Sequence, residues 1–181
     1  DPTETNEGLD LTVDPSGAAK TGTWAPTFGT GEVTVSAWAK WEGPSQSWPW
    51  QGLVCSRSAG ADPQGDVRNF LLEIQPSGIL QVNAAGTILT STTLPIGQWA
   101  HVVLSASADE YVIYIDGVPA ATMAPAVTVR EEIVPLYLGA IDRDAQGFRS
   151  VFHGAIDDVR IYRHAKSKFE IADLYYAITE T

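Results

Sequence analysis

The chain has 181 residues, of which 44% are hydrophobic and 18% are charged, and its 22 acidic and 11 basic side chains give a formal net charge of −11. This length fits one domain with a sizeable core, and the composition is that of a folded protein rather than a disordered one. The acidic balance disfavours nucleic acids and anionic membrane surfaces as partners, because both would be repelled. No apolar run approaches the ~20 residues that a membrane span needs.

Alternation of apolar and polar residues with a period of two predicts β-strands along most of the chain. In the clearest run, Val33, Val35, Ala37, Ala39 and Trp41 share one face, which is the pattern of a half-buried strand. Turns rich in Gly, Pro and Asp join neighbouring runs into hairpins. The predicted strands cover residues 33–41, 69–75, 79–84, 87–91, 100–106, 111–116, 118–123, 134–138 and 155–162. Short strands at this spacing predict an all-β, antiparallel sandwich.

One short helix is predicted near the C-terminal end. Ser167 and Glu170 have the S-x-x-E spacing of a capping box, and apolar residues follow at helical spacing, so we expect a helix over residues 167–177. Residues 1–30 alternate poorly, and we expect them to pack on the sandwich with one edge strand. Residues 1–181 are therefore predicted to form a single domain. Cys55 is the only cysteine, and we interpret it as a buried packing residue.

Five sequence blocks in a fixed order resemble the laminin-G-like, concanavalin A-like jelly-roll modules. The blocks are VTVSAWAK from Val33, GQWAHV from Gly97, YIDG from Tyr114, LYLG from Leu136 and FHGAIDDVRIY from Phe152. The resemblance implies a two-sheet jelly-roll β-sandwich in a secreted or cell-surface protein. Such modules commonly bind carbohydrate or mediate adhesion as accessory parts of larger proteins, often with structural calcium. The stretch around Asp10 matches loosely the Phe-Asp-Gly strand that usually opens these modules, and Asp10 is one candidate calcium ligand.

Asp157 is the second candidate calcium ligand. Strand alternation places it on the same face as Val159 and Ile161, and an inward carboxylate needs a partner because burying an uncompensated charge costs several kcal/mol. Calcium is one such partner, since it prefers carboxylate and carbonyl oxygens, and backbone N–H donors without a metal are the alternative. Asp158 and Arg160 fall on the opposite face, where we expect a surface ion pair.

A second acidic cluster occupies residues 142–147. Asp142 and Asp144 have the opening spacing of an EF-hand loop, which makes them candidate calcium ligands, but the distant Glu of that motif and its flanking helices are missing. A solvated turn is the favoured interpretation of this cluster. The segment from Asp62 to Asp66 is interpreted in the same way.

Three of the six tryptophans lie within ten residues, in the Pro- and Ser-containing stretch from Trp41 to Trp50. Exposed indoles provide flat apolar platforms on which the C–H face of a sugar ring stacks. For Trp48 and Trp50 we keep two interpretations open, a glycan platform and a lid folded over the end of a sheet. For Trp41, as for Trp38 and Trp99, a place in or beside a strand favours packing.

Polar residues that follow this stretch could donate hydrogen bonds to sugar hydroxyls. The predicted ligand-binding residues are therefore Trp48, Trp50, Trp41, Arg57, Arg68 and Asn69. The strands carry no E-x-D-x-x-E arrangement of paired carboxylates, no G-x-S-x-G elbow is present, and the three histidines lack zinc spacing.

These patterns favour a non-catalytic carbohydrate-binding or adhesion module of a larger extracellular protein, stabilised by calcium and directed at a neutral glycan. The start at Asp1 without an initiator methionine favours an excised module or a mature product. A protein-binding or structural spacer of the same fold is the alternative, and a polysaccharide hydrolase or lyase is the third possibility.

Overall fold

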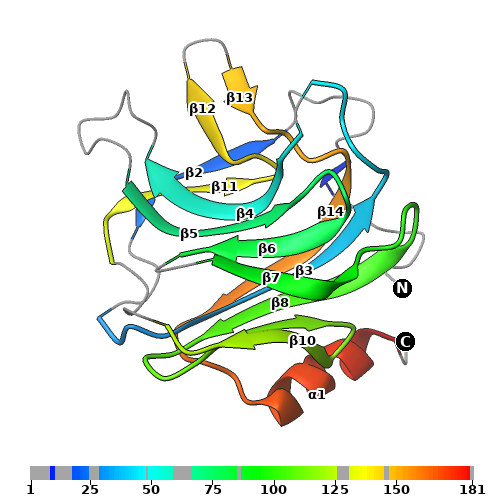
Figure 1. Cartoon of the computed structure of the whole chain (residues 1–181). Coiled ribbons are helices and arrows are strands. Elements are labelled where there is room, and N and C mark those ends of the chain that lie inside the picture. Colours follow the sequence, from blue (N-terminus) through cyan, green and yellow to red (C-terminus); the bar gives the residue numbers. More distant parts are fainter. Residues whose placement is uncertain are drawn as a thin grey trace.

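The computed structural model describes residues 9–10, 18–24, 29–47, 49–58, 67–84, 87–125, 131–144 and 147–179. These residues form two six-stranded antiparallel sheets that lie face to face, a two-stranded hairpin and one helix (Figure 1). The predicted jelly-roll β-sandwich with one short C-terminal helix is confirmed. Helix α1 (Lys168–Thr179) has 12 residues. Within the described part of the chain, no helix is long and apolar enough to cross a membrane.

The two sheets differ in where their strands come from along the chain. The first sheet has the order β1 (Leu9–Asp10), β14 (Gly154–Tyr162), β3 (Val33–Trp41), β8 (Trp99–Ala106), β9 (Tyr111–Ile115) and β10 (Val118–Met123). The second sheet has the order β2 (Ala19–Trp24), β11 (Val134–Leu138), β4 (Gln51–Ser58), β5 (Val67–Ile74), β6 (Ile79–Asn83) and β7 (Thr87–Thr93). The hairpin consists of β12 (Asp142–Asp144) and β13 (Gly147–Arg149), and the helix is α1 (Lys168–Thr179).

The main hydrophobic core lies between the two sheets. The alternating residues of β3 point into it, and Val33, Val35, Ala37 and Ala39 are all completely buried there. Phe70 and Leu72 of β5 close the core from the opposite sheet. Burial of this inner face supplies the main driving force for pairing the sheets, at roughly 25 cal/mol per Å² of apolar surface.

Strand β4 is the main element that the sequence pattern missed. All eight of its residues are buried, so both of its faces are covered and the sequence shows no alternation of apolar and polar residues. Val54 points into the core between the sheets, whereas Cys55 packs on the other face with Leu71 and Tyr137. The interpretation of Cys55 as a packing residue is confirmed.

The hairpin β12–β13 covers part of the outer face of the second sheet (Figure 1). Its entry crosses β4 at Gly52, where an added Cβ would lie only 2.4 Å from the backbone carbonyl carbon of Ala140. Gly52 N also donates to Ser150 O on the return from the hairpin (2.8 Å). Glycine is therefore required at this position because no side chain fits beneath the crossing segment.

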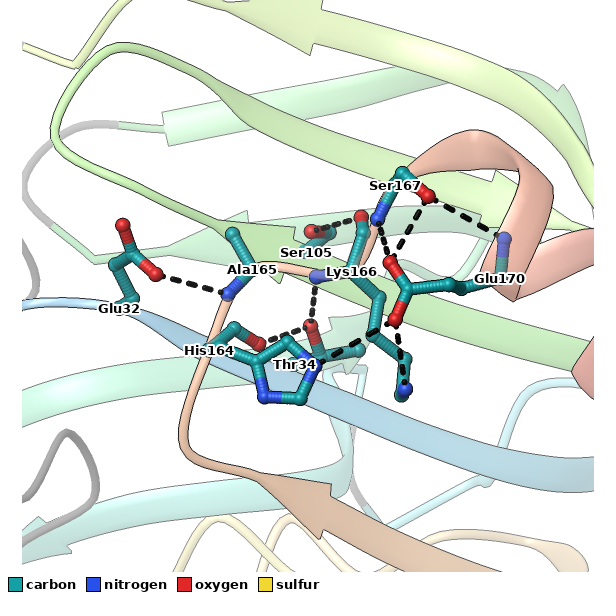
Figure 2. A network of polar contacts seen from close by, with 8 residues as sticks. All are labelled: Glu32, Thr34, Ser105, His164, Ala165, Lys166, Ser167 and Glu170. Carbon is teal, nitrogen blue, oxygen red and sulfur yellow. Dashed lines mark hydrogen bonds and ion pairs between the residues drawn. The ribbon is translucent and has the colours of Figure 1, made fainter.

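Helix α1 covers the outer face of the first sheet, on the opposite side of the sandwich from the hairpin (Figure 1). Ile171 packs on Val103, Val112 and Tyr114, which point away from the core. Glu170 accepts from Ser167 N at 2.9 Å, so the predicted capping box is confirmed (Figure 2). The predicted boundaries, 167–177, agree closely with Lys168–Thr179.

The second half of α1 packs on two aromatic rings of the first sheet, those of Trp38 and His101. Tyr175 stacks on Trp38 at 5.8 Å and on His101 at 6.1 Å between ring centroids. His101 Nε2 lies 2.9 Å from Ser36 Oγ, so this histidine has a structural hydrogen bond outside the core. Trp38 is 4% exposed beneath the helix, so it is a packing residue of the outer face.

The predicted orientation of Asp157 is wrong because β14 contains a bulge. Asp157 pairs with Trp38, and the next paired residue is Arg160, opposite Ser36. Asp158 lies in this bulge with a φ of 45°, in the left-handed region. The extra residue puts Asp157 on the outer face with Trp38, while Val159 and Ile161 pack against the core. The expected surface ion pair is confirmed, with Arg160 Nε 2.7 Å from Asp158 Oδ1.

The outer edge of the first sheet is irregular. Strand β10 pairs only with β9, and its register shifts between Pro119 and Ala121. Proline has no N–H to donate, so its presence in an edge strand is compatible with this position.

We predict that His101 makes the protein sensitive to acid. Burial lowers the pKa of His101 from 6.5 to about 4, the nearby Asp158 raises it and Arg160 lowers it. As pH falls below 6.5 the unfolded chain takes up this proton first, so stability is lost progressively between pH 6.5 and 4. Between pH 7 and pH 4.5 the loss from this group is about 2–3 kcal/mol.

Denaturant unfolding of the wild type and His101→Gln at the two pH values measures this loss. The variant should lose less stability on acidification than the wild type. His164→Gln is the control, since the side chain of His164 is 53% exposed. Equal acid sensitivity in the wild type and His101→Gln would contradict the prediction.

Candidate functional site

The outer face of the second sheet carries a row of hydrogen-bonded polar side chains beside the hairpin. Gln75 Nε2 donates to Gln81 Oε1 (3.2 Å), and Gln81 Nε2 donates to Glu73 Oε1 (2.8 Å). Glu73 and Gln81 are directly paired across β5 and β6, so their side chains leave the sheet on the same side. The row therefore crosses two strands on the face that points away from the core.

A buried ion network lies beside this row, between β4 and the hairpin. Asp142 is 2% exposed and contacts Arg57 Nη1 at 3.1 Å. Arg149 makes a bidentate contact with the same carboxylate, in which Nε donates to Oδ1 (2.6 Å) and Nη2 donates to Oδ2 (2.8 Å). Paired N–H···O bonds of this kind fix both distance and orientation. The network ties the hairpin to the sheet.

The charged groups of this face influence one another. Arg68 pairs with Arg57 across β4 and β5. Burial raises the pKa of Glu73, and the hydrogen bond from Gln81 and the charges of Arg68 and Arg57 partly oppose this rise. Burial, followed by the negative charge of Glu73, also raises the pKa of the Cys55 thiol well above its ordinary value. Cys55 is therefore a protonated packing residue rather than a reactive thiolate.

Trp50 stands at one end of the polar row. Gln51 is paired with Ile74, so the residues immediately beyond this pair, Trp50 and Gln75, are neighbours at the end of the two strands. Trp50 is 36% exposed, and Gln75, Arg68 and Asn83 are partly exposed. The face thus combines an accessible indole with amide and guanidinium groups.

Gln51 holds the segment that leads into Trp50. Its side-chain oxygen accepts from Trp41 Nε1 (3.2 Å) and from His153 N (2.9 Å), and its amide nitrogen donates to Gly43 O (3.1 Å). Gln51 is 1% exposed, so these bonds are shielded from water. One buried amide therefore fixes two other stretches of chain, residues 41–43 and the segment at His153, to the start of β4.

Two of the predicted ligand-binding residues, Trp41 and Asn69, are buried and engaged within the fold. Trp41 is 3% exposed and belongs to the core, where an added Cβ at Gly78 would lie 2.6 Å from its ring. The Asn69 amide is occupied internally, because it donates to Glu132 O (2.8 Å) and accepts from Glu132 N (3.0 Å). It joins β5 to the start of β11.

The structure brings two of the predicted ligand-binding residues together, since Arg57 and Arg68 are paired in the second sheet, and Trp50 immediately precedes β4 at the other end of that strand. Trp48 and the segment 62–66 lie outside the described residues. Arg57 is 9% exposed and serves mainly to hold Asp142.

The four predicted calcium ligands fall in two places: Asp142 and Asp144 are on β12, whereas Asp10 and Asp157 are on the adjacent strands β1 and β14. Asp142 is not in a solvated turn, because it is buried in β12 and neutralised by two guanidinium groups. Asp144 and Asp10 are described only through their backbones, which pair with Gly147 and Ala155. Within the described ranges, no group of three or more His, Cys, Asp or Glu is placed to hold a metal ion.

Several residues of this face were missed by the sequence analysis. Glu73, Gln75, Gln81 and Asn83 alternate with the inward apolar residues of the predicted hairpin. Matching polar positions on two paired strands would have indicated a polar outer face. No comparable signal marks Arg149, because its role depends on how the hairpin folds back over β4.

Comparisons with known proteins agree with this architecture. A family model described as the concanavalin A-like lectin/glucanases superfamily matches residues 14–172. No curated protein matches the sequence significantly.

Similar folds occur in solved structures that share little sequence identity with this chain. A candidate carbohydrate-binding protein from Bacteroides ovatus has a TM-score of 0.65 and 16% identity, over 84% of this chain and 43% of that one. Trypanosoma rangeli sialidase in complex with sialic acid has a TM-score of 0.63 and 19% identity, over 82% of this chain and 23% of that one. Domain 4 of an extracellular arabinanase from Geobacillus stearothermophilus, in complex with arabinotriose, has a TM-score of 0.55 and 22% identity, over 86% and 68%. The chain thus spans about a quarter of the sialidase and less than half of the Bacteroides protein.

We predict that Asp142→Asn destabilises the fold by about 2–4 kcal/mol. The substitution keeps the shape of the side chain but removes the negative charge that compensates Arg57, whose side chain is only 11% exposed. Arg149 is 42% exposed and regains hydration, which keeps the cost below that of a fully buried pair.

Denaturant unfolding of this variant should be compared with that of Asp158→Asn. The control breaks a surface ion pair, worth ~0–1 kcal/mol, and asparagine tolerates the left-handed backbone there. Similar losses in the two variants would show that the buried network does not hold the hairpin in place.

Proposed function

Because the chain belongs to the concanavalin A-like lectin/glucanase superfamily, we propose that it is a non-catalytic carbohydrate-binding or adhesion module of a larger extracellular protein. The glycan binds across the outer face of the second sheet, with Trp50 as its stacking platform. The observation that supports this proposal most directly is the accessible indole beside the Gln75–Gln81–Glu73 row.

The chemistry of the face suits a neutral sugar chain. A sugar ring presents C–H groups that stack on an indole and hydroxyls that exchange hydrogen bonds with amides. The charges beside the row are already compensated, since Asp142 contacts two guanidinium groups and Glu73 lies near Arg68. Hydroxyl groups can use such a surface without separating these charges.

The same charge pairing argues against a hydrolase at this face. A glycosidase of the usual type needs two carboxyl groups about 5–9.5 Å apart, one to transfer a proton and one to act as nucleophile or base. Here Asp142 is enclosed by Arg57 and Arg149, and Glu73 is 5% exposed and accepts from Gln81. Neither carboxyl group is presented to a glycosidic bond.

Proteins with similar folds support the proposed role as an accessory module and the proposed extracellular location. The arabinanase domain was solved with arabinotriose and comes from an extracellular enzyme, and the Bacteroides protein is longer than this chain. We extend these properties to the present chain as part of the proposal.

Trp50→Ala tests the proposed platform. We expect retention on a neutral polysaccharide in affinity gels to weaken about tenfold, because losing a stacking contact costs roughly 1–2 kcal/mol. The melting temperature should change by less than about 2 °C, as for other surface substitutions.

Phe169→Ala is the matched control, since Phe169 is an exposed aromatic residue (71%) on α1, far from the polar row. Full retention of the Trp50→Ala protein on the polysaccharide would contradict the role of Trp50 as the stacking platform. A large drop in its melting temperature would instead support the lid, and with it the structural spacer. Release of reducing sugar from the polysaccharide would overturn the non-catalytic assignment.

Calcium stabilisation is part of the same proposal, and Asp157 is its best-placed ligand. Asp10 pairs with Ala155, two positions before Asp157, so two candidate ligands lie on adjacent strands. Calcium takes carboxylate, carbonyl and water oxygens, so carbonyl groups and water can complete a shell that Asp157 begins.

We expect a higher melting temperature in calcium than in chelator for the wild type, because an ion that binds only the folded state stabilises it. Differential scanning calorimetry should show this difference reduced in Asp157→Asn and kept in Asp173→Asn, whose side chain is exposed on α1. Identical curves with calcium and with chelator would count against a structural ion.

A further inference from the structure

Hydrogen bonds fix the beginning of helix α1 to the first sheet. In the segment before the helix, Ser105 Oγ donates to Lys166 O (2.9 Å), and Lys166 N donates to Thr34 Oγ1 (2.8 Å) (Figure 2). The Glu170 carboxylate then accepts from Ser167 N and from Ser167 Oγ, both at 2.9 Å, which closes the first turn. The start of α1 is therefore tied to β3 and β8 by bonds that fix its position and direction.

The second half of α1 packs on the sheet through the ring of Tyr175. Ile171 is completely buried, but residues 172–177 are all partly or fully exposed. The ring of Tyr175 lies over Trp38 and His101, with 5.8 Å and 6.1 Å between centroids. A helix of this length is only marginally stable in water by itself, so a second half that leaves the sheet would also unwind.

Docking of α1 leaves two buried nitrogen atoms without hydrogen bonds. Trp38 is 4% exposed and His101 is 1% exposed, and their ring centroids lie 5.3 Å apart. Neither Trp38 Nε1 nor His101 Nδ1 has a hydrogen-bond partner among the described residues. A buried polar group without a partner costs free energy, and water would remove this cost once the helix moved away. The closed arrangement therefore carries a penalty that opening relieves.

The charged groups around His101 belong to the sheet and its turns. Burial is the main influence and lowers the pKa of His101 to about 4, while the negative charge of Asp158 raises it and Arg160 lowers it. Asp116, which follows β9, accepts from His101 N (2.8 Å) rather than from the ring. From α1 the imidazole faces Tyr175, whose pKa is raised by burial and by Asp116, so its hydroxyl stays protonated. His101 is therefore neutral while α1 covers it.

We propose that the second half of α1 is a pH-dependent cover, which leaves the first sheet in mild acid when His101 takes up a proton. Opening brings water to the imidazole and stabilises its charged form. It also hydrates the indole nitrogen of Trp38. In acid the outer face of the first sheet then presents an indole and a cationic imidazole that are hidden at neutral pH. This device does not depend on the proposed glycan platform.

The other end of the helix stays closed over the same pH range. Hydrogen bonds from Ser167, helped by Lys166, lower the pKa of Glu170 to about 2, so the cap remains ionised above pH 4. The bonds at Thr34 and Ser105 involve hydroxyl and backbone groups, which do not titrate in acid. Opening therefore starts at the C-terminal end of α1.

Amide hydrogen exchange of the intact chain, followed by NMR at pH 7 and pH 5, tests this proposal. If His101 has a pKa of about 4 when covered and 6.5 when uncovered, the opening equilibrium rises about twentyfold between these pH values. Protection of amides 173–176, corrected for the intrinsic exchange rate, should fall by this factor. Their exchange should also be insensitive to low concentrations of urea, which marks a local opening, whereas amides of β3 should exchange faster in urea.

Two variants and one control locate the switch. His101→Gln stays neutral at both pH values, so protection of amides 173–176 should no longer depend on pH in this way. Tyr175→Ala should move the pKa of the His101 ring towards 6.5 in an NMR titration, because the ring is no longer covered. Phe169→Ala removes an exposed aromatic residue (71%) from the first turn of the same helix and should leave that titration unchanged.

Three results would each overturn the proposal. The first is an equal fall in protection in the wild type and His101→Gln. The second is exchange of the α1 amides only in step with the amides of β3, because α1 would then open only when the whole fold does. The third is a pKa of His101 that Tyr175→Ala leaves unchanged, since α1 would then not be the cover.

Discussion

The contact of Asp142 with Arg57 and Arg149 fixes the hairpin β12–β13 on the outer face of the second sheet. Its inner face is held by apolar burial, which has no direction, whereas the placement of the hairpin on its outer face needs specific bonds. The ion network supplies them, and Gly52 permits the close crossing that brings Asp142 over β4. Because the hairpin covers only part of the face, the Gln75–Gln81–Glu73 row remains beside it.

The two sheets use different means to cover their outer faces. The first sheet is covered by α1, whose Ile171 and Tyr175 pack on aliphatic and aromatic side chains. The second sheet is covered by a charged hairpin and otherwise carries amides. The second sheet thus leaves polar side chains partly exposed on its outer face, among them Gln75 and Asn83.

The features that could be predicted from sequence are those set by local periodicity. The alternation from Val33 to Trp41 matched β3 at both ends, and the spacing of Ser167 and Glu170 located the start of α1. The Asp157 error came from one bulge residue, since a single insertion reverses every later position of a strand. The buried role of Asp142 was equally out of reach, because it depends on Arg57, 85 positions earlier, being brought under the hairpin by the fold. Long-range pairings of this kind leave no local pattern.

The irregular edge at β10 affects how copies of this protein meet one another. An edge strand with a full row of N–H and C=O groups invites a strand from a neighbour, whereas Pro119 lacks a donor and the register shift beside it distorts the row. A continuous intermolecular sheet is therefore disfavoured along this border. The border at β10 therefore favours molecules that stay separate over molecules joined edge to edge.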